Sequence, residues 1–154
     1  MNRRNFAVLI ACAAIGFMAA SSSVAWAGQT APGTVNVPTG EVDLGSVELP
    51  RRVMADGRTL ASGTYDLRVT VDSANPDAPG QLAVLERWVE FRQGDEVKGR
   101  EVVSIVPQSE IDSVAKSAPP GNGTVRVEML KGNEYLRVWV NQDNTHYFIH
   151  LVAG

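Results

Sequence analysis

Two short turn motifs near the C-terminus constrain the fold of this chain more than any other feature of its sequence. Gly132-Asn133 and Asp143-Asn144 are residue pairs typical of two-residue hairpin loops, because Gly, Asn and Asp tolerate the positive φ angles that such loops need. A two-residue loop also fixes which residues of the flanking strands face one another. Each motif therefore predicts a strand register that the side chains can support or refute.

The side chains agree with both registers. The first loop gives the pairs Lys131 with Glu134, Met129 with Leu136, Glu128 with Arg137, Val127 with Val138, and Arg126 with Trp139. The second loop gives the pairs Val140 with Tyr147, Val138 with Ile149, Leu136 with Leu151, Trp139 with Phe148, and Arg137 with His150. A slip of one residue would turn the whole apolar set to solvent. We therefore predict a three-stranded antiparallel meander from about Thr124 to Val152.

Further strands are expected upstream. Residues 63–72 alternate strictly, with Tyr65, Leu67, Val69 and Val71 on the apolar face of a strand whose other face is wet. A loop follows over residues 72–80. Two β-rich segments, 82–92 and 97–106, have the pattern of a hairpin around residues 93–96, although their pairing stays open. No simple register puts all of their apolar residues on one side, so we expect a bulge or a longer turn.

One short helix is expected near residues 109–116. Ser109-Glu110-Ile111-Asp112 has the form of a helix-capping start, and Pro119-Pro120-Gly121 prevents a long continuation. Many strands with turns between them and a single helix favour an all-β antiparallel β-sandwich over residues 41–154, with a small β-barrel as the alternative.

A local resemblance points to the same fold. Residues 60–69, Leu60-Ala61-Ser62-Gly63-Thr64-Tyr65-Asp66-Leu67-Arg68-Val69, carry an L-x-x-G-x-Y pattern. This pattern resembles the start of a strand in exported prealbumin-like and carboxypeptidase-regulatory-like sandwich domains. The resemblance implies a β-sandwich and no particular activity.

The N-terminus has the order of a secretory signal peptide. Arg3 and Arg4 precede an apolar run over residues 6–20, and Ala25-Trp26-Ala27 ends the segment with small residues at the two positions that signal peptidase reads. The apolar run is shorter than the roughly 20 residues that cross a bilayer. We expect cleavage after Ala27, a flexible lead segment over residues 28–40, and a periplasmic or extracellular bacterial protein with no membrane span after cleavage.

The leader allows two finer interpretations. Arg3-Arg4-Asn5-Phe6 resembles the twin-arginine export signal, so the choice between this route and ordinary unfolded export stays open. Leu9-Ile10-Ala11-Cys12 resembles a lipoprotein site, but the apolar run continues beyond Cys12, which disfavours lipidation. Cys12 is the only cysteine. The mature chain is therefore expected to have no disulfide and no cysteine nucleophile or metal ligand.

Charge and motifs exclude several classes of function. The chain has a formal net charge of −3 and loses Arg3 and Arg4 with the leader, which argues against nucleic-acid binding. His146 and His150 lie four residues apart on one expected strand, about 13 Å, so they do not share a metal ion. We therefore expect no metal and no cofactor.

Enzymatic activity is the less favoured interpretation. No G-x-S-x-G element suggests a serine nucleophile. A carboxylate-based hydrolase remains the alternative, because Glu86, Glu90, Glu101 and Glu128 are on or near strands. Such residues are also common on the solvated faces of antiparallel sheets.

The candidate binding site is the outer face of the meander. The two registers gather there Arg126, Glu128, Arg137, Trp139, His146, Phe148 and His150. An exposed Trp139 and Phe148 pair, bounded by polar groups, suits a carbohydrate, a peptide or an envelope protein. Two alternatives need no ligand: the chain's own N-terminal strand or helix covers this face, or Arg126 stacks on Trp139 to stabilise the sheet.

Taken together, these features predict an exported, non-enzymatic β-sandwich that binds a ligand or partner in the bacterial envelope. A small carboxylate-based hydrolase and a purely structural envelope protein are the alternatives.

Overall fold

The C-terminal meander forms in the predicted register. The computed structural model describes residues 37–74 and 85–154, which belong to one compact unit, Thr34–Gly154. Strands β7 (Thr124–Leu130), β8 (Tyr135–Gln142) and β9 (Thr145–Ala153) contain the strand pairs that the two loops predict, except Lys131 with Glu134, which lie in the turn between β7 and β8. Gly132 and Asn133 have φ angles of 62° and 74°, and Asp143 and Asn144 have 52° and 58°. The four loop residues therefore adopt the positive φ angles that their residue types predict.

Strand β4 (Gly63–Ser73) lies between β1 (Val42–Leu49) and β5 (Glu86–Gln93). Tyr65, Leu67 and Val69 are buried as predicted. Val71 is 59% exposed, so its predicted inward position is wrong. The cause is a shift in the pairing of β4 with β5 after Val69, which interrupts the alternation of faces.

The expected bulge is present between β5 and β6 (Glu96–Pro107). Phe91 faces Gly99 whereas Arg92 faces Val97, so Lys98 is the additional residue on β6. The hairpin prediction is thereby confirmed over the part that is described. Residues 82–84 of the predicted strand, and residues 75–80 of the predicted loop, lie outside the described residues.

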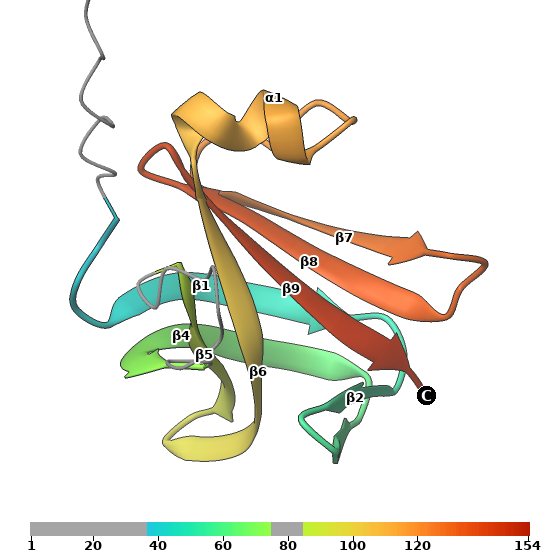
Figure 1. Cartoon of the computed structure of the whole chain (residues 1–154). Coiled ribbons are helices and arrows are strands. Elements are labelled where there is room, and N and C mark those ends of the chain that lie inside the picture. The colour runs from blue at the N-terminus through green and yellow to red at the C-terminus, as the bar shows by residue number, and fades with distance from the viewer. Residues whose placement is uncertain (1–36, 75–84) are drawn as a thin grey trace, which may run out of the picture. The chain divides into compact units, whose positions relative to one another are not determined.

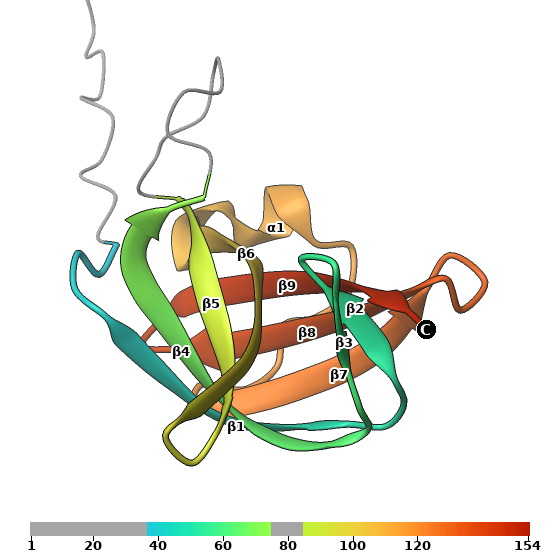
Figure 2. The same cartoon turned by 90° about the horizontal axis from the view of Figure 1, so that it is seen from below.

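Strand β6 connects two layers. Its first part, through Ser104, pairs with β5, while Val103–Pro107 pairs with β9. As a result β1, β4 and β5 form one layer and β7, β8 and β9 form the other (Figures 1 and 2). The hairpin of β2 (Val53–Ala55) and β3 (Arg58–Leu60) pairs with the end of β9.

The sheet does not close on itself. Strand β7 pairs with β8 and β1 pairs with β4, and among the described residues no pairing joins β1 to β7. The all-β antiparallel sandwich with one short helix is therefore confirmed, and the barrel alternative is wrong.

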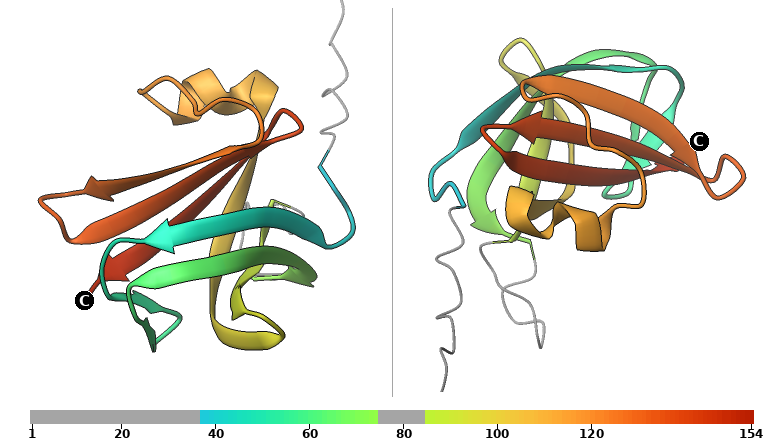
Figure 3. Two further views of the ribbon diagram at one scale, coloured as in Figure 1. Left: turned by 180° about the vertical axis from the view of Figure 1, so that it is seen from behind. Right: turned by 90° about the horizontal axis from the view of Figure 1, so that it is seen from above.

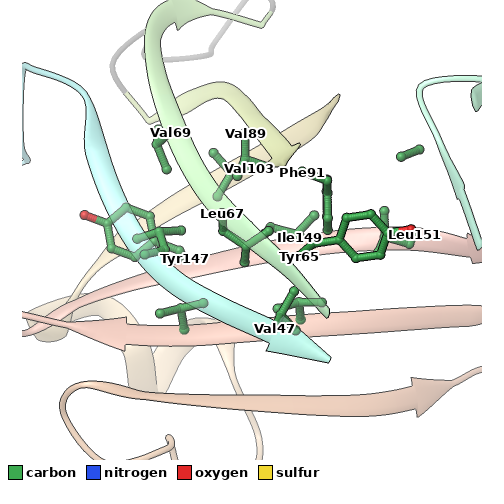
Figure 4. Close-up of a cluster of buried hydrophobic side chains, with 14 of the residues drawn as sticks. Val47, Tyr65, Leu67, Val69, Val89, Phe91, Val103, Tyr147, Ile149 and Leu151 are labelled. Carbon is green, nitrogen blue, oxygen red and sulfur yellow. The ribbon is translucent and has the colours of Figure 1, made fainter. Parts of the chain in front are cut away.

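The main core fills the space between the two layers (Figure 4). Leu67, Phe91 and Ile149 are fully buried, and the rings of Tyr65 and Phe91 meet edge to face with centroids 6.1 Å apart. The Tyr65 hydroxyl donates a hydrogen bond to the carbonyl of Ala61 at 3.0 Å. These residues come from both layers, so the core fixes how the layers face one another.

The helical segment is shorter than predicted and is capped differently. A single 3-10 turn, η1 (Gln108–Glu110), runs into α1 (Ile111–Val114). The predicted side-chain cap is wrong: Ser109 makes no capping hydrogen bond, whereas the Ser113 hydroxyl donates to the carbonyl of Glu110 at 2.7 Å. Ile111 is buried and Val114 is 55% exposed. The helix therefore packs through Ile111 alone.

Candidate binding face

The outer face of the meander carries four rows of side chains, because residues in register on three strands line up across the sheet. From the end near α1 to the end near the β7–β8 turn, the rows are Thr124–Asn141–His146, Arg126–Trp139–Phe148, Glu128–Arg137–His150 and Leu130–Tyr135–Val152. All of the site residues predicted from the sequence lie in the first three rows.

The aromatic row is covered by the chain's own helical segment. The ribbon of the helical segment lies over the outer side of the meander (Figure 3). Ile111 packs on Trp139 and Phe148 in a second, smaller core. Trp139 is 0% exposed and Phe148 is 4% exposed, with ring centroids 4.7 Å apart. The expectation that this pair is exposed is wrong. The alternative that a helix of the chain covers the face is the one that the structure shows.

His146 is buried beneath the same segment and links it to the sheet. The Trp139 Nε1–H donates to His146 Nδ1 at 3.1 Å. Because Nδ1 accepts this bond, the ring proton lies on Nε2, which donates to Gln108 Oε1 at 2.9 Å. Burial lowers the pKa of His146. His146 is therefore a neutral internal link between η1 and β9, with no surface for a ligand.

The two arginines flank the buried rings. The guanidinium carbon of Arg126 lies 5.5 Å from the Trp139 ring centroid, and Arg126 donates to the carbonyl of Ala118 at 2.7 Å. The guanidinium carbon of Arg137 lies 5.3 Å from the Trp139 ring and 5.6 Å from the Phe148 ring. Arg137 also donates twice to Glu128 Oε1, at 3.0 and 2.6 Å. These contacts stabilise the sheet, as the second alternative expected for Arg126.

His150 is the first residue along β9 from the covered end whose side chain on the outer face of the meander is exposed to solvent. It is exposed, in contrast to His146 on the same strand. Desolvation lowers the pKa of His150, the nearby cations Arg137 and Lys131 lower it further, and Glu101 opposes them. His150 is thus a polar group at the surface that is held toward its neutral form near pH 7.

The fourth row remains uncovered. Leu130 and Tyr135 are half-buried, and Val152 is 49% exposed. A surface cavity of about 310 Å³ is lined by Leu130, Lys131, Tyr135 and His150. We call the group formed by Leu130, Lys131, Tyr135, Arg137, His150 and Val152 the open meander patch.

Lys131 supplies the charge of this patch. Its Nζ lies 5.2 Å from the Tyr135 ring centroid. Within the described residues it takes part in none of the ion pairs, whereas Arg137 is neutralised by Glu128. The patch therefore combines apolar surface with one cation that is available to a ligand.

Sequence reasoning missed Leu130, Lys131, Tyr135 and Val152. The two predicted registers already imply the fourth row. The first register pairs Leu130 with Tyr135, and the second, extended by one residue, pairs Tyr135 with Val152. The larger aromatic pair, Trp139 and Phe148, favoured the end of the face that the helix covers.

A larger surface cavity of about 440 Å³ lies between the β2–β3 turn and β6. Two of its charged groups bind each other: Arg100 Nε contacts Asp56 Oδ2 at 3.1 Å, and the Arg100 guanidinium also stacks over Trp88 at 4.1 Å. Glu101 accepts the backbone N–H of Asp56 at 2.8 Å. The described residues that line this cavity include no aromatic side chain, whereas Tyr135 lines the cavity of the open meander patch.

The carboxylates considered for a hydrolase have separate partners. Glu90 binds Arg92, Glu128 binds Arg137, and Glu101 accepts backbone N–H groups. The described residues contain no group of three or more candidate metal ligands. No helix in this part of the chain is long and apolar enough to cross a membrane.

Comparison with protein-family models, with curated proteins and with solved structures finds no match for this chain. The resemblance at residues 60–69 to prealbumin-like and carboxypeptidase-regulatory-like domains stays a prediction. The leader lies outside the described residues, and cleavage after Ala27 stays a prediction as well.

Proposed function

We propose that this chain is an exported, non-enzymatic β-sandwich that binds a ligand or partner of the bacterial envelope through the open meander patch. The observation that carries the proposal is the cavity beside Tyr135, which holds apolar surface next to the cation of Lys131. It lies on the half of the meander face that α1 leaves uncovered. The signal-like N-terminus supports the location.

The chemistry of the patch favours a ligand with an apolar group and an acidic group. Leu130, Tyr135 and Val152 offer apolar contact area, and an aromatic ring provides it at small entropic cost. Lys131 is the available cation, because Glu128 already neutralises Arg137. A peptide segment of an envelope protein that carries an acidic residue beside an apolar one satisfies both requirements.

The test begins with capture of envelope proteins and a glycan array, followed by titration of each hit. Tyr135→Ala is expected to weaken binding by about thirtyfold, the effect of losing a central aromatic anchor. Trp88→Ala is the matched control, because Trp88 is also half-buried on an outer face but lies on β5. Lys131→Ala is expected to weaken binding and to reduce its dependence on salt.

Two results would contradict the proposal. Equal affinities for Tyr135→Ala and the unaltered chain would place the binding site elsewhere. A greater loss with Trp88→Ala would move it to the face of β5 and β6. Circular dichroism of each variant shows that the fold is retained, since Tyr135 is outside both buried cores.

A further inference from the structure

The two outer strands of the sheet differ in how well they accept a further strand. Strand β1 has a register shift between Asp43 and Gly45, with Gly45 at φ 77°, and such bulges twist an edge away from new partners. Strand β7 pairs with β8 without interruption from Thr124 to Leu130. It contains no proline and, in the described part of the chain, pairs with β8 alone.

The free edge of β7 presents the backbone groups of alternate residues. The β7–β8 turn closes with a hydrogen bond from the Glu134 N–H to the Lys131 carbonyl at 3.3 Å. In β8, the Asn141 carbonyl accepts the Gly123 N–H at 2.7 Å on the β7 side, whereas the Glu134 carbonyl accepts the Ala153 N–H at 2.9 Å on the β9 side. Because successive residues point their backbone groups to opposite edges, the odd-numbered residues of β8 bond to β7, and their partners Arg126 and Glu128 bond to β8. The N–H and C=O groups of Val125, Val127 and Met129 therefore point to the edge away from β8.

The side chains of β7 also favour the addition of a further strand. Val125, Val127 and Met129 face inward against the main core but are only partly buried, because β7 is the last strand of its layer. An added strand would cover the exposed part of these side chains. Uncovered apolar side chains beside a regular strand edge are the two features that favour strand addition.

We propose that the occupant of this edge is the β7 strand of a second copy of the chain, paired antiparallel about a two-fold axis at Val127. In this register the Arg126 of each copy faces the Glu128 of the other, and Val125 faces Met129. Opposite charges and apolar pairs directly across two strands are stabilising. The strand is thus complementary to itself.

The neighbouring registers are unfavourable. Only residues whose backbone groups point outward can bond across the new edge, so the strands shift by one such pair at a time. A shift in one direction places Arg126 opposite its own copy, and a shift in the other places Glu128 opposite its own copy. Like charges directly opposite are destabilising, so the charge pattern selects the register centred on Val127.

The first test measures the mass of the exported chain by sedimentation over a range of concentrations, with a charge exchange between two variants. Arg126→Glu places two acidic residues opposite each other in a homodimer, and Glu128→Lys places two basic residues there. Each variant alone is expected to dimerise about tenfold more weakly. An equal mixture restores opposite charges at both pairs, so the heterodimer is expected to form as well as the unaltered dimer.

The second test reads the register directly and does not depend on those charges. In a Cys12→Ala background, Val127→Cys brings two thiols together at a hydrogen-bonded pair whose Cα atoms lie about 5.5 Å apart, within the range for a disulfide. Val125→Cys is the matched control, because its own copy lies about 13 Å away along the strand. Oxidation is expected to cross-link the first variant and leave the second monomeric.

A chain that is monomeric at millimolar concentration overturns the proposal, even if β7 captures a different protein. Equal cross-linking at residues 125 and 127 refutes the register, as does a mixture of the charge variants that dimerises no better than either alone. Circular dichroism identifies a charge variant that fails to fold, and the cysteine pair then decides the question.

Discussion

Trp139 and His146 share a buried hydrogen bond of 3.1 Å that joins β8 to β9 beneath the helical segment. The same imidazole binds Gln108 through its other nitrogen, so one ring holds the sheet and η1 together. The arrangement requires a neutral His146, because Nδ1 has to accept the indole proton. The packing of the helical segment on the aromatic row therefore depends on pH.

Stability is expected to fall as the pH drops below the pKa of an unfolded histidine, about 6.5. Burial lowers the pKa of His146 in the folded chain, so the unfolded chain takes up the proton first. The stabilisation is complete above pH 6.5 and is lost toward the lower folded pKa, with a limiting slope of about 1.4 kcal/mol per pH unit. Urea denaturation from pH 8 to pH 5 measures it.

The control for this pH dependence is His150, whose pKa is also lowered. Each variant, His146→Gln or His150→Gln, is expected to remove the part of the slope that its own histidine supplies, but only His146→Gln is also expected to lower the stability at pH 8, because it breaks the buried link. If His150→Gln removes the whole slope, the buried link does not control the pH response.

Trp139→Ala is expected to destabilise the fold severely, by about 3–5 kcal/mol, because the deleted ring leaves a cavity between Ile111 and Phe148. Trp88→Ala is expected to cost less, because Trp88 is only half-buried and its main contact is the Arg100 guanidinium at 4.1 Å. Chemical denaturation compares the two. Similar losses would mean that α1 does not seal the aromatic row in solution.

Val138→Asp is expected to destabilise by several kcal/mol, since Val138 is 0% exposed between Val127 and Ile149 on the central strand of the meander. Thr70→Asp, at a half-buried position on the outer side of β4, is expected to have a small effect. The midpoints of denaturation distinguish the two. Equal midpoints would show that the inner and outer faces of these strands are misassigned.

Arg87 holds the N-terminal end of the described chain. It is 2% exposed and donates to the carbonyls of Pro38, Gly40 and Thr70 at 2.7, 2.5 and 2.5 Å. Burial raises the pKa of the neighbouring Tyr147 to about 12, although the charge of Arg87 acts in the opposite direction. The tyrosine therefore stays neutral at ordinary pH and does not neutralise the guanidinium.

Arg87→Met is expected to cost about 3 kcal/mol or more, because three carbonyls lose a charged donor at once. It is also expected to increase hydrogen exchange at residues 39–41. Arg92→Met is the matched control, since Arg92 binds Glu90 and the carbonyl of Asp95 near the surface. Unchanged exchange at residues 39–41 in Arg87→Met would show that this segment is held by other contacts.

The open meander patch shows how far sequence reasoning reached toward the site. The registers placed Arg137 and His150 on the outer face correctly, because register depends on turn chemistry and alternation within a short stretch of chain. The same local patterns do not predict how much of that face is exposed to solvent. Trp139 and Phe148 look like a recognition pair until Ile111, from a different part of the chain, is packed on them.

The sequence by itself determined the elements that depend on neighbours along the chain: the two C-terminal hairpins, the alternating strand β4 and the bulged hairpin of β5 and β6. The tertiary structure alone decided which of their faces meet water. Arg87 binds carbonyls far away in the sequence, and Ile111 covers one half of the meander face while Tyr135 stays open. Turn angles and strand alternation are local properties, whereas burial is settled by segments that meet only when the whole chain has folded.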